Sequence, residues 1–238
     1  MFDTEELALH KDYSIWNYDY ALSFGVEIPT EVIRDLLPAP LSPFEVRPAV
    51  SVLAVTVMHF MEGNHNFGRS FTEMTFALNV VSDFARAGRV PRFAMYVLNM
   101  GADDTGFAAD SYNSDLLPFY PEALEIEVNA EEHRVRCHDE KGNHIFSFES
   151  TLENPDYDIN EDFFQVFAMH QGELHHGAVT TLGLSYEHQR ADHARFEFSN
   201  HPIFGGVDVT KVSQPYIQML AAPSTEARQV YFRLSPMR

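Results

Sequence analysis

The sequence has few lysines and a large excess of acidic residues. Its 238 residues include only three lysines, Lys11, Lys141 and Lys211, and the formal net charge at pH 7 is −19. Proteins bind nucleic acids and anionic membrane surfaces through clustered cationic side chains. The composition therefore argues against both as partners, and an acidic surface of this kind favours solubility.

Cysteine and long hydrophobic runs are also scarce. Cys137 is the only cysteine, so the chain cannot form an internal disulfide. It stands in the segment HRVRCHD, where the alternation of residues indicates a small, inward-facing strand residue. No stretch approaches the roughly 18 consecutive apolar residues of a transmembrane helix. The first residues are acidic and lack the apolar core of a secretory signal, so we expect a cytoplasmic protein.

Hydrophobic residues are nevertheless plentiful, at 45% of the chain, and 20 residues are Phe. This content is typical of a globular protein with a large core. All-β barrels of this length commonly fold as one domain, and we expect a single domain spanning residues 1–238.

Alternating hydrophobicity predicts a mainly β protein with about ten strands and two or three short helices. Residues 46–60 form an apolar, β-branched run typical of a central strand, and residues 71–81 return as its hairpin partner. Residues 124–150 predict a three-strand meander with Lys141 at a turn tip. Short helices are expected at residues 4–11, after Pro29, and at residues 209–221 with Asp208 as the cap.

The alternation within residues 71–81 separates two faces of one strand. The more apolar set, expected in the core, contains Thr72, Met74, Phe76 and Leu78. The opposite set contains Phe71, Glu73, Thr75 and Ala77. Glu73 is therefore predicted to face a different space from the core.

Residues 106–121, GFAADSYNSDLLPFYP, interrupt the strand pattern and are predicted to form a loop that carries the chemistry. In this segment ADSY (109–112), followed by LPFY (117–120), is similar to the signature that bears the paired lysines of the acetoacetate decarboxylase superfamily. Residues 24–43, FGVEIPTEVIRDLLPAPLSP, resemble the family's strand, short helix and proline-rich element. Residues 70–81, SFTEMTFALNVV, resemble its strand with the Y-x-E motif.

The resemblance implies a closed or partly closed antiparallel β-barrel with a few short helices. The family decarboxylates β-keto acids through a lysine imine, but Phe119 and Tyr120 stand at the positions of its lysines. The family's carboxylate-binding arginine is replaced in the segment NYDY (17–20), unless Arg47, Arg69 or Arg92 takes its place. Two acidic positions of the family are retained in this sequence. Glu73 stands at the glutamate of the Y-x-E motif, and Asp110 stands at a second acidic position.

These residues lead to a hypothesis of a lysine-independent enzyme. It would act as a proton-transfer lyase, isomerase or cyclase on a small keto, enol or polyene molecule, without a cofactor. Its catalytic residues would be Glu73, Asp110 and Tyr112. Its substrate-binding residues would be Tyr18, Tyr20, Phe71, Asp115, Phe119 and Tyr120.

Other interpretations stay open at this point. Glu73 can instead be a structural acid, the aspartates can be turn formers, and the tyrosines can be packing residues. The barrel can be a non-catalytic binder of apolar molecules, or a true decarboxylase that uses Lys11 or Lys211. No metal site is expected, because adjacent histidines such as His175 and His176 point to opposite faces of a strand. We also expect a homo-oligomer.

Overall fold

The computed structural model describes residues 13–62, 68–81, 93–152, 156–188, 193–222 and 227–237. The predicted helix at residues 4–11, Lys11 and Arg92 lie outside this range. The described helical elements are α2 (Thr30–Ile33), η1 (Arg34–Leu36), α3 (Thr105–Ser114), η4 (Pro202–Phe204) and η5 (Val209–Lys211). None of the helices in the described ranges is long and apolar enough to cross a membrane.

The rest of the described chain is mainly strand, as the alternation predicted. The strands are β1 (Tyr13–Pro29), β2 (Ser42–Pro43), β3 (Glu45–Arg47), β4 (Val50–Phe60), β5 (Phe71–Val81), β6 (Phe93–Ala102), β7 (Leu124–Asn129), β8 (Arg134–Asp139), β9 (His144–Ser150), β10 (Asp158–His170), β11 (Glu173–His188), β12 (Ala194–Phe198), β13 (Pro215–Ala221) and β14 (Ala227–Pro236).

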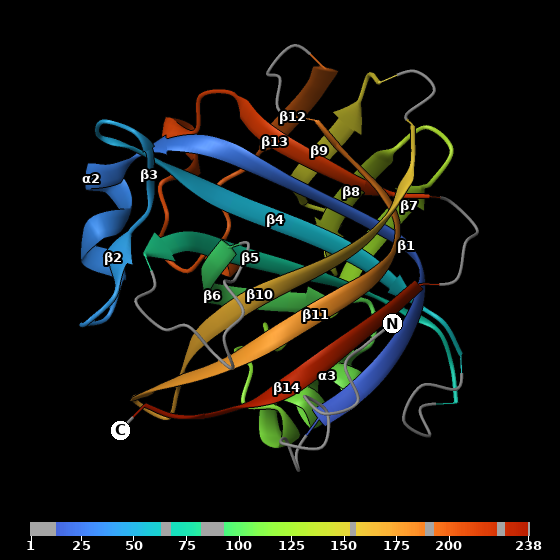
Figure 1. Ribbon diagram of the computed structural model, residues 1–238, viewed down its shortest axis with the longest axis horizontal. Helices are drawn as coiled ribbons and strands as arrows, with labels where there is room; N and C mark the ends of the chain where they lie inside the picture. Colours follow the sequence, from blue (N-terminus) through green and yellow to red (C-terminus); the bar gives the residue numbers. More distant parts are fainter. Residues whose placement is uncertain are drawn as a thin grey trace.

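Within the described part of the chain, 7 strands close into a barrel (Figure 1). In order around the ring they are β1, β14, β11, β10, β6, β5 and β4, and β4 pairs again with β1. The closed barrel confirms the prediction, but the barrel is mixed and not purely antiparallel. β6 and β10 run parallel through residues 93–97 and 164–168. A parallel neighbour requires a long crossover, and residues 103–157 supply it.

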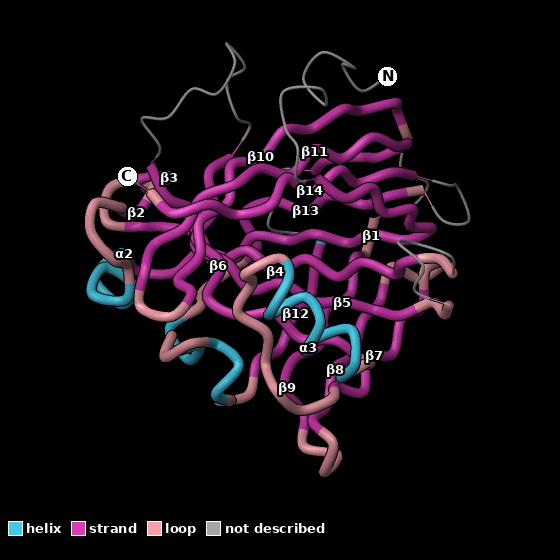
Figure 2. The backbone as a smooth tube through the Cα atoms, turned by 90° about the horizontal axis from the view of Figure 1, so that it is seen from below, coloured by secondary structure: helices cyan, strands magenta, loops and turns pink. Residues whose placement is uncertain are grey.

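The crossover carries most of a second, four-stranded sheet in the order β12, β9, β8, β7. Figure 2 shows this sheet beside the barrel, on the side away from β10, β11 and β14. The space between the two sheets is the main hydrophobic core. There Phe24 of β1 stacks on Phe148 of β9 with ring centroids 4.1 Å apart. Cys137 of β8 is fully buried in this core, in agreement with the inward position predicted for it.

The two faces of β5 separate as predicted. Met74, Phe76 and Leu78 point outward from the barrel into the core beneath the second sheet. Glu73 and Thr75 point into the barrel. The strand is therefore buried on both sides, and its polar set faces an interior space.

Two local predictions are wrong. The segment expected to be a loop contains α3, because the Asp104 carboxylate caps the helix by accepting a hydrogen bond of 3.0 Å from the Phe107 amide. Residues 209–221, expected to be helical, form η5 and then β13. Asp208 does cap η5, but Pro215 interrupts a helix there and β13 pairs with both β1 and β11.

Candidate functional site

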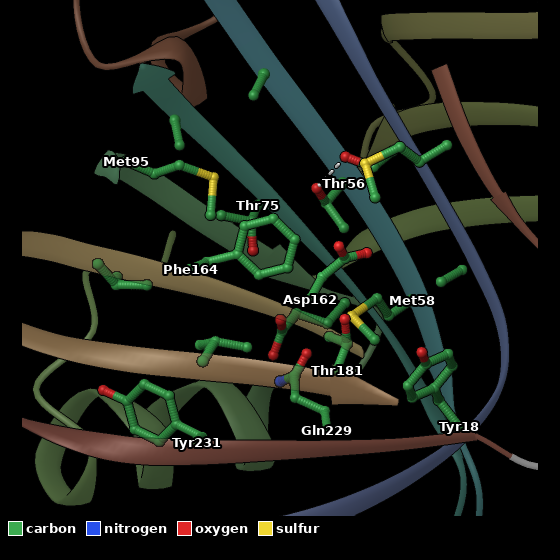
Figure 3. A pocket seen from close by; sticks show the side chains of 18 of the residues that line it. Tyr18, Thr56, Met58, Thr75, Met95, Asp162, Phe164, Thr181, Gln229 and Tyr231 are labelled. Carbon is green, nitrogen blue, oxygen red and sulfur yellow. Dashed lines mark hydrogen bonds between the residues drawn. The ribbon is translucent and has the colours of Figure 1, made fainter. Parts of the chain in front are cut away.

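The barrel encloses a cavity of about 190 Å³. Its walls come from α3 and from β1, β4, β5, β6, β10, β11, β13 and β14. Figure 3 shows labelled side chains from several of these strands directed into the same space.

Glu73 is a buried acid on this wall whose pKa is strongly raised. It is 9% exposed and lies on β5 opposite Met58 of β4. Burial raises the pKa of its carboxyl from 4.5 to about 8, and the nearby Asp115 carboxylate adds to the rise. A hydrogen bond from the Thr75 hydroxyl opposes the rise without cancelling it. At neutral pH the Glu73 carboxyl therefore holds its proton at the wall of the barrel cavity.

α3 and the segment after it fill the side of the barrel where β6 runs past the end of β10. The backbone of Met100 on β6 donates to Pro118 and accepts from Tyr120, both at 2.7 Å. Phe107, Ser111 and Asp115 thereby come to line the cavity. The backbone hydrogen bonds of Met100 thus help to position Asp115, whose negative charge raises the pKa of Glu73.

Tyr231 of β14 fixes the end of α3 from the other side. Its hydroxyl donates a 2.8 Å hydrogen bond to the backbone carbonyl of Asp115. Burial raises the pKa of the Tyr231 phenol above its usual value, and the charges of Asp115 and Glu73 act in the same direction. Tyr231 is therefore a neutral phenol beside the two acids.

A second polar group crosses the strands β10, β11 and β14. Asp162 pairs with Thr181, and Thr181 pairs with Gln229, so the three side chains form a row on the inner face of the barrel (Figure 3). We call Asp162, Thr181 and Gln229 the β10–β14 row. Burial raises the pKa of Tyr18 to about 12, and the negative charge of Asp162 contributes to the rise.

Hydroxyl groups occupy the opposite wall. Ser23 and Thr56 hydrogen bond to each other at 2.8 Å, and Thr75 lies opposite Thr56 on the next strand. Threonine and serine hydroxyls both donate and accept hydrogen bonds. This wall can orient a polar ligand without adding charge.

None of the described residues that line the cavity is Lys, Arg or His. Arg47 is paired with Glu27 at 2.5 Å and is half exposed, and Arg69 is paired with Asp104. Lys141 and Lys211 are exposed at the surface. In the described ranges no group of three or more His, Cys, Asp or Glu is arranged to hold a metal ion.

The structure brings together only part of the predicted site. Glu73, Asp115 and Tyr18 line the cavity. Phe71 and Phe119 do not line the cavity but contact Phe107, which does, with ring centroids 3.8 and 5.5 Å from it.

The remaining predicted residues lie elsewhere. Asp110 is exposed on α3, and Tyr112 is 39% exposed and contacts the ring of His170. Tyr20 and Tyr120 pack in the core between the barrel and the four-stranded sheet. Tyr20 faces away from the cavity because the pairing of β1 with β4 shifts between Tyr18 and Tyr20, which reverses the inward and outward positions that follow.

The sequence pattern did not predict the β10–β14 row or Tyr231 as part of the site. The polar composition of residues 151–162 is typical of a loop, but Asp162 belongs to β10. The sequence signal for it is the alternation along the strand. Every second residue of a strand faces the same side, and Asn160, Asp162 and Phe164 all line the cavity.

No protein-family model and no curated protein matches the sequence. Solved structures do match. An acetoacetate decarboxylase has a TM-score of 0.63 at 12% identity, over 100% of this chain and 95% of that chain. An acetoacetate decarboxylase-like enzyme from Sphingomonas wittichii RW1 has a TM-score of 0.59 at 11% identity, over 95% of this chain and 94% of that chain.

The enduracididine biosynthesis enzyme MppR, with HEPES bound, has a TM-score of 0.62 at 8% identity, over 94% of this chain and 87% of that chain. MppR is also known in complex with the condensation product of pyruvate and imidazole 4-carboxaldehyde. At these identities the likeness is one of fold. The protein therefore has the acetoacetate decarboxylase-like fold, mainly β with a closed, mixed barrel of 7 strands.

Proposed function

We propose that the protein is a lysine-independent enzyme that acts on a small molecule within the barrel by proton transfer. The reaction would be an elimination, isomerisation or cyclisation of a small keto, enol or polyene compound. The observation that carries the proposal is the buried Glu73 carboxyl, whose pKa of about 8 lets it hold a proton at neutral pH and release it to a bound substrate. Enzymes of the same fold act on small molecules, which supports a small-molecule substrate.

Glu73 would act first as an acid. In an isomerisation or cyclisation its carboxyl proton passes to a carbonyl oxygen or an unsaturated carbon of the substrate, and in an elimination it passes to the leaving group as the bond from carbon to that group breaks. The resulting Glu73 carboxylate then takes a proton from a neighbouring carbon. Asp115 lowers the cost of positive charge that develops on the substrate in between, because it places a negative charge in the same enclosed space. Glu73 ends the cycle protonated again, so no co-reactant is consumed.

Three neighbouring groups would position the substrate. Tyr231 and Thr75 supply hydroxyl groups beside Glu73, and Tyr18 supplies a neutral phenol on the wall near Asp162. Asp110 and Tyr112, expected from the sequence to assist Glu73, do not line the cavity.

The cavity volume limits the substrate. An apolar cavity of about 150 Å³ accommodates benzene, so about 190 Å³ admits a molecule the size of a small substituted ring. A polyene substrate would therefore be short or already folded.

The decarboxylase alternative requires an amine in the cavity. Lys211 is exposed in η5 and does not line the cavity, and Lys11 lies outside the described residues. Incubation with a β-keto acid and borohydride, followed by peptide mass spectrometry, tests this directly. We expect no adduct on any lysine, and a stable adduct on Lys11 or Lys211 would overturn the proposal.

Solvent deuterium provides the test of proton transfer. A panel of small ketones, enols and short dienes is incubated with the protein in D₂O, and incorporation at carbon is followed by mass spectrometry. We expect the wild-type protein to label at least one compound, Glu73→Gln to lose the labelling, and Asp110→Asn to retain it. Compounds that co-purify with the protein but never gain deuterium would support the rival interpretation, a non-catalytic binder.

A further inference from the structure

The charge on the cavity walls constrains the substrate more narrowly than its size does. Three carboxyl groups, those of Glu73, Asp115 and Asp162, line the cavity, and none of the described lining residues is cationic. Among the described lining residues, a substrate carboxylate or phosphate would find no positive partner. Burying an unpaired anion beside other anions costs several kcal/mol or more, so anionic substrates are disfavoured.

Asp162 is distinct from the acids at the proposed proton-transfer site. It lies on β10 and is only 8% exposed. Its negative charge acts on Tyr18, whereas the charge of Asp115 acts on Glu73 and Tyr231. The cavity therefore has two acidic regions with different neighbours.

The β10–β14 row offers three oxygen acceptors on adjacent strands. They are the carboxylate of Asp162, the hydroxyl of Thr181 and the amide carbonyl of Gln229. An ammonium group has three N–H donors and no acceptor, so its hydrogen-bonding capacity matches this row. A carboxylate ligand has acceptors alone and finds only the Thr181 hydroxyl and the Gln229 amide group as donors there.

Two aromatic side chains of β1 lie near the β14 end of the row. Trp16 of β1 pairs directly with Gln229, and the hydroxyl of Tyr18 lies close to Gly183, two residues beyond Thr181 on β11. Both rings line the cavity. Aromatic rings attract organic cations, and they also accommodate the apolar part of such a ligand.

We propose that the β10–β14 row binds a primary ammonium group, so that the substrate is a small organic amine whose reacting carbon or carbonyl reaches Glu73. This inference rests on the proposed function, because it treats the cavity as the substrate site. Only β6 separates β10 from β5 in the barrel. Glu73 of β5 and Asp162 of β10 line the same cavity, so an amine held by Asp162 lies in the space that the Glu73 carboxyl borders.

Binding measurements with three probes of similar size test the proposal at pH 7. The probes are benzylamine, which is cationic, benzyl alcohol, which is neutral, and benzoate, which is anionic. We expect benzylamine to bind at least about tenfold more tightly than benzyl alcohol in titration calorimetry, since a hydrogen bond between charged groups contributes more than a neutral one. Benzoate should bind most weakly.

Two variants assign the preference to the row. Asp162→Asn should reduce the affinity for benzylamine by about tenfold or more and leave benzyl alcohol nearly unchanged. Asp158→Asn, which removes an exposed carboxylate from the same strand, is the matched control for the general effect of the acidic surface and should retain the preference. If Asp162→Asn does not fold, Thr181→Val removes one acceptor with little change in shape and should give a smaller loss of the same kind.

Several results would overturn the inference. They are equal affinity for the three probes, tighter binding of benzoate, an unchanged preference in Asp162→Asn, or no binding of any probe. Failure of the proposed function is a separate result. If Glu73→Gln retains deuterium labelling while Asp162→Asn loses the preference for benzylamine, the proton-transfer assignment is wrong and the amine site stands.

Discussion

Tyr231 and Asp115 are joined by a hydrogen bond of 2.8 Å between the phenol of one and the backbone carbonyl of the other. The bond ties β14, at one end of the described chain, to the C-terminal end of α3. It thereby holds the Asp115 side chain in the cavity beside Glu73.

Removal of this hydrogen bond should destabilise the protein. We expect Tyr231→Phe to lower the free energy of unfolding by about 1 kcal/mol, because the Asp115 carbonyl loses a buried donor. Urea denaturation measures the change. Tyr13→Phe, at a tyrosine that is 41% exposed, is the control and should have little effect. Equal effects of the two substitutions would contradict the role of the bond.

Glu73 should make stability depend on pH. Its carboxyl has a pKa of about 8 in the folded protein against 4.5 ordinarily, so the folded state holds a proton that the unfolded state has released. Its contribution to stability is therefore complete below about pH 4.5 and is lost as the pH rises to about 8. The loss is at most about 1.4 kcal/mol per pH unit.

Glu73→Gln isolates this contribution, since the amide does not titrate. The free energies of unfolding of the wild-type protein and the variant are compared by urea denaturation from pH 4 to pH 9. We expect the wild-type protein to lose stability relative to Glu73→Gln across this range. A constant difference between the two proteins would show that folding does not change the pKa of the Glu73 carboxyl.

The stacking of Phe24 on Phe148 joins the barrel to the four-stranded sheet. Phe148→Ala should therefore lower the free energy of unfolding by about 3–5 kcal/mol, because it leaves a cavity in the main core. Phe44→Ala, at a ring that is 41% exposed, should change it by less than about 0.5 kcal/mol. Thermal or chemical denaturation of both variants checks the difference, and similar losses would argue against close packing between the two sheets.

Gly177 permits a close approach of β11 and β14, whose pairing shifts register between His176 and Ala178. A Cβ atom at Gly177 would lie 2.6 Å from the backbone oxygen of Phe232, and a backbone atom cannot move aside cheaply. We expect Gly177→Ala to cost about 1–3 kcal/mol of stability, in the range of other overpacking substitutions. Gly68→Ala is the control, since a Cβ there has no atom within 4 Å. A neutral effect at Gly177 would mean that the two strands separate easily.

The sequence predicted the strands well where one face is apolar and the other is not. In β5 the alternation separated Met74 and Phe76 from Glu73 and Thr75, and the structure places the two sets on opposite sides of the barrel wall. The prediction succeeded because it needs only local information. In any extended strand, successive side chains point to opposite faces.

The predictions that failed depend on contacts distant in sequence. α3 has many polar residues and little amphipathic pattern, and it forms under the Asp104 cap, the stacking of Phe107 on Phe71 and the bond from Tyr231. The parallel pairing of β6 with β10 joins residues about 70 positions apart. Neither relationship leaves a local signal.

The site shows the same division. Glu73 was identified because it is an acid inside an apolar strand. Asp162 was not identified, because its strand begins in a polar segment that is also typical of a loop. Only the pairing of Asp162 with Thr181, and of Thr181 with Gln229, shows that its side chain faces the cavity. The residues assigned through ADSY, Asp110 and Tyr112, lie on the outer side of a helix that the sequence did not predict.

The closure of the barrel between β1 and β14 has a consequence for synthesis. Proteins are made from the N-terminus, and β1 emerges from the ribosome long before the strand with which it pairs through residues 13–18 and 227–232. Until β14 has been made, the nascent chain exposes an open sheet edge that is prone to association with other chains. Shorter nascent chains also lack Gln229 and Tyr231, so a ligand that binds in the cavity can stabilise the protein only after its last described strand has left the ribosome.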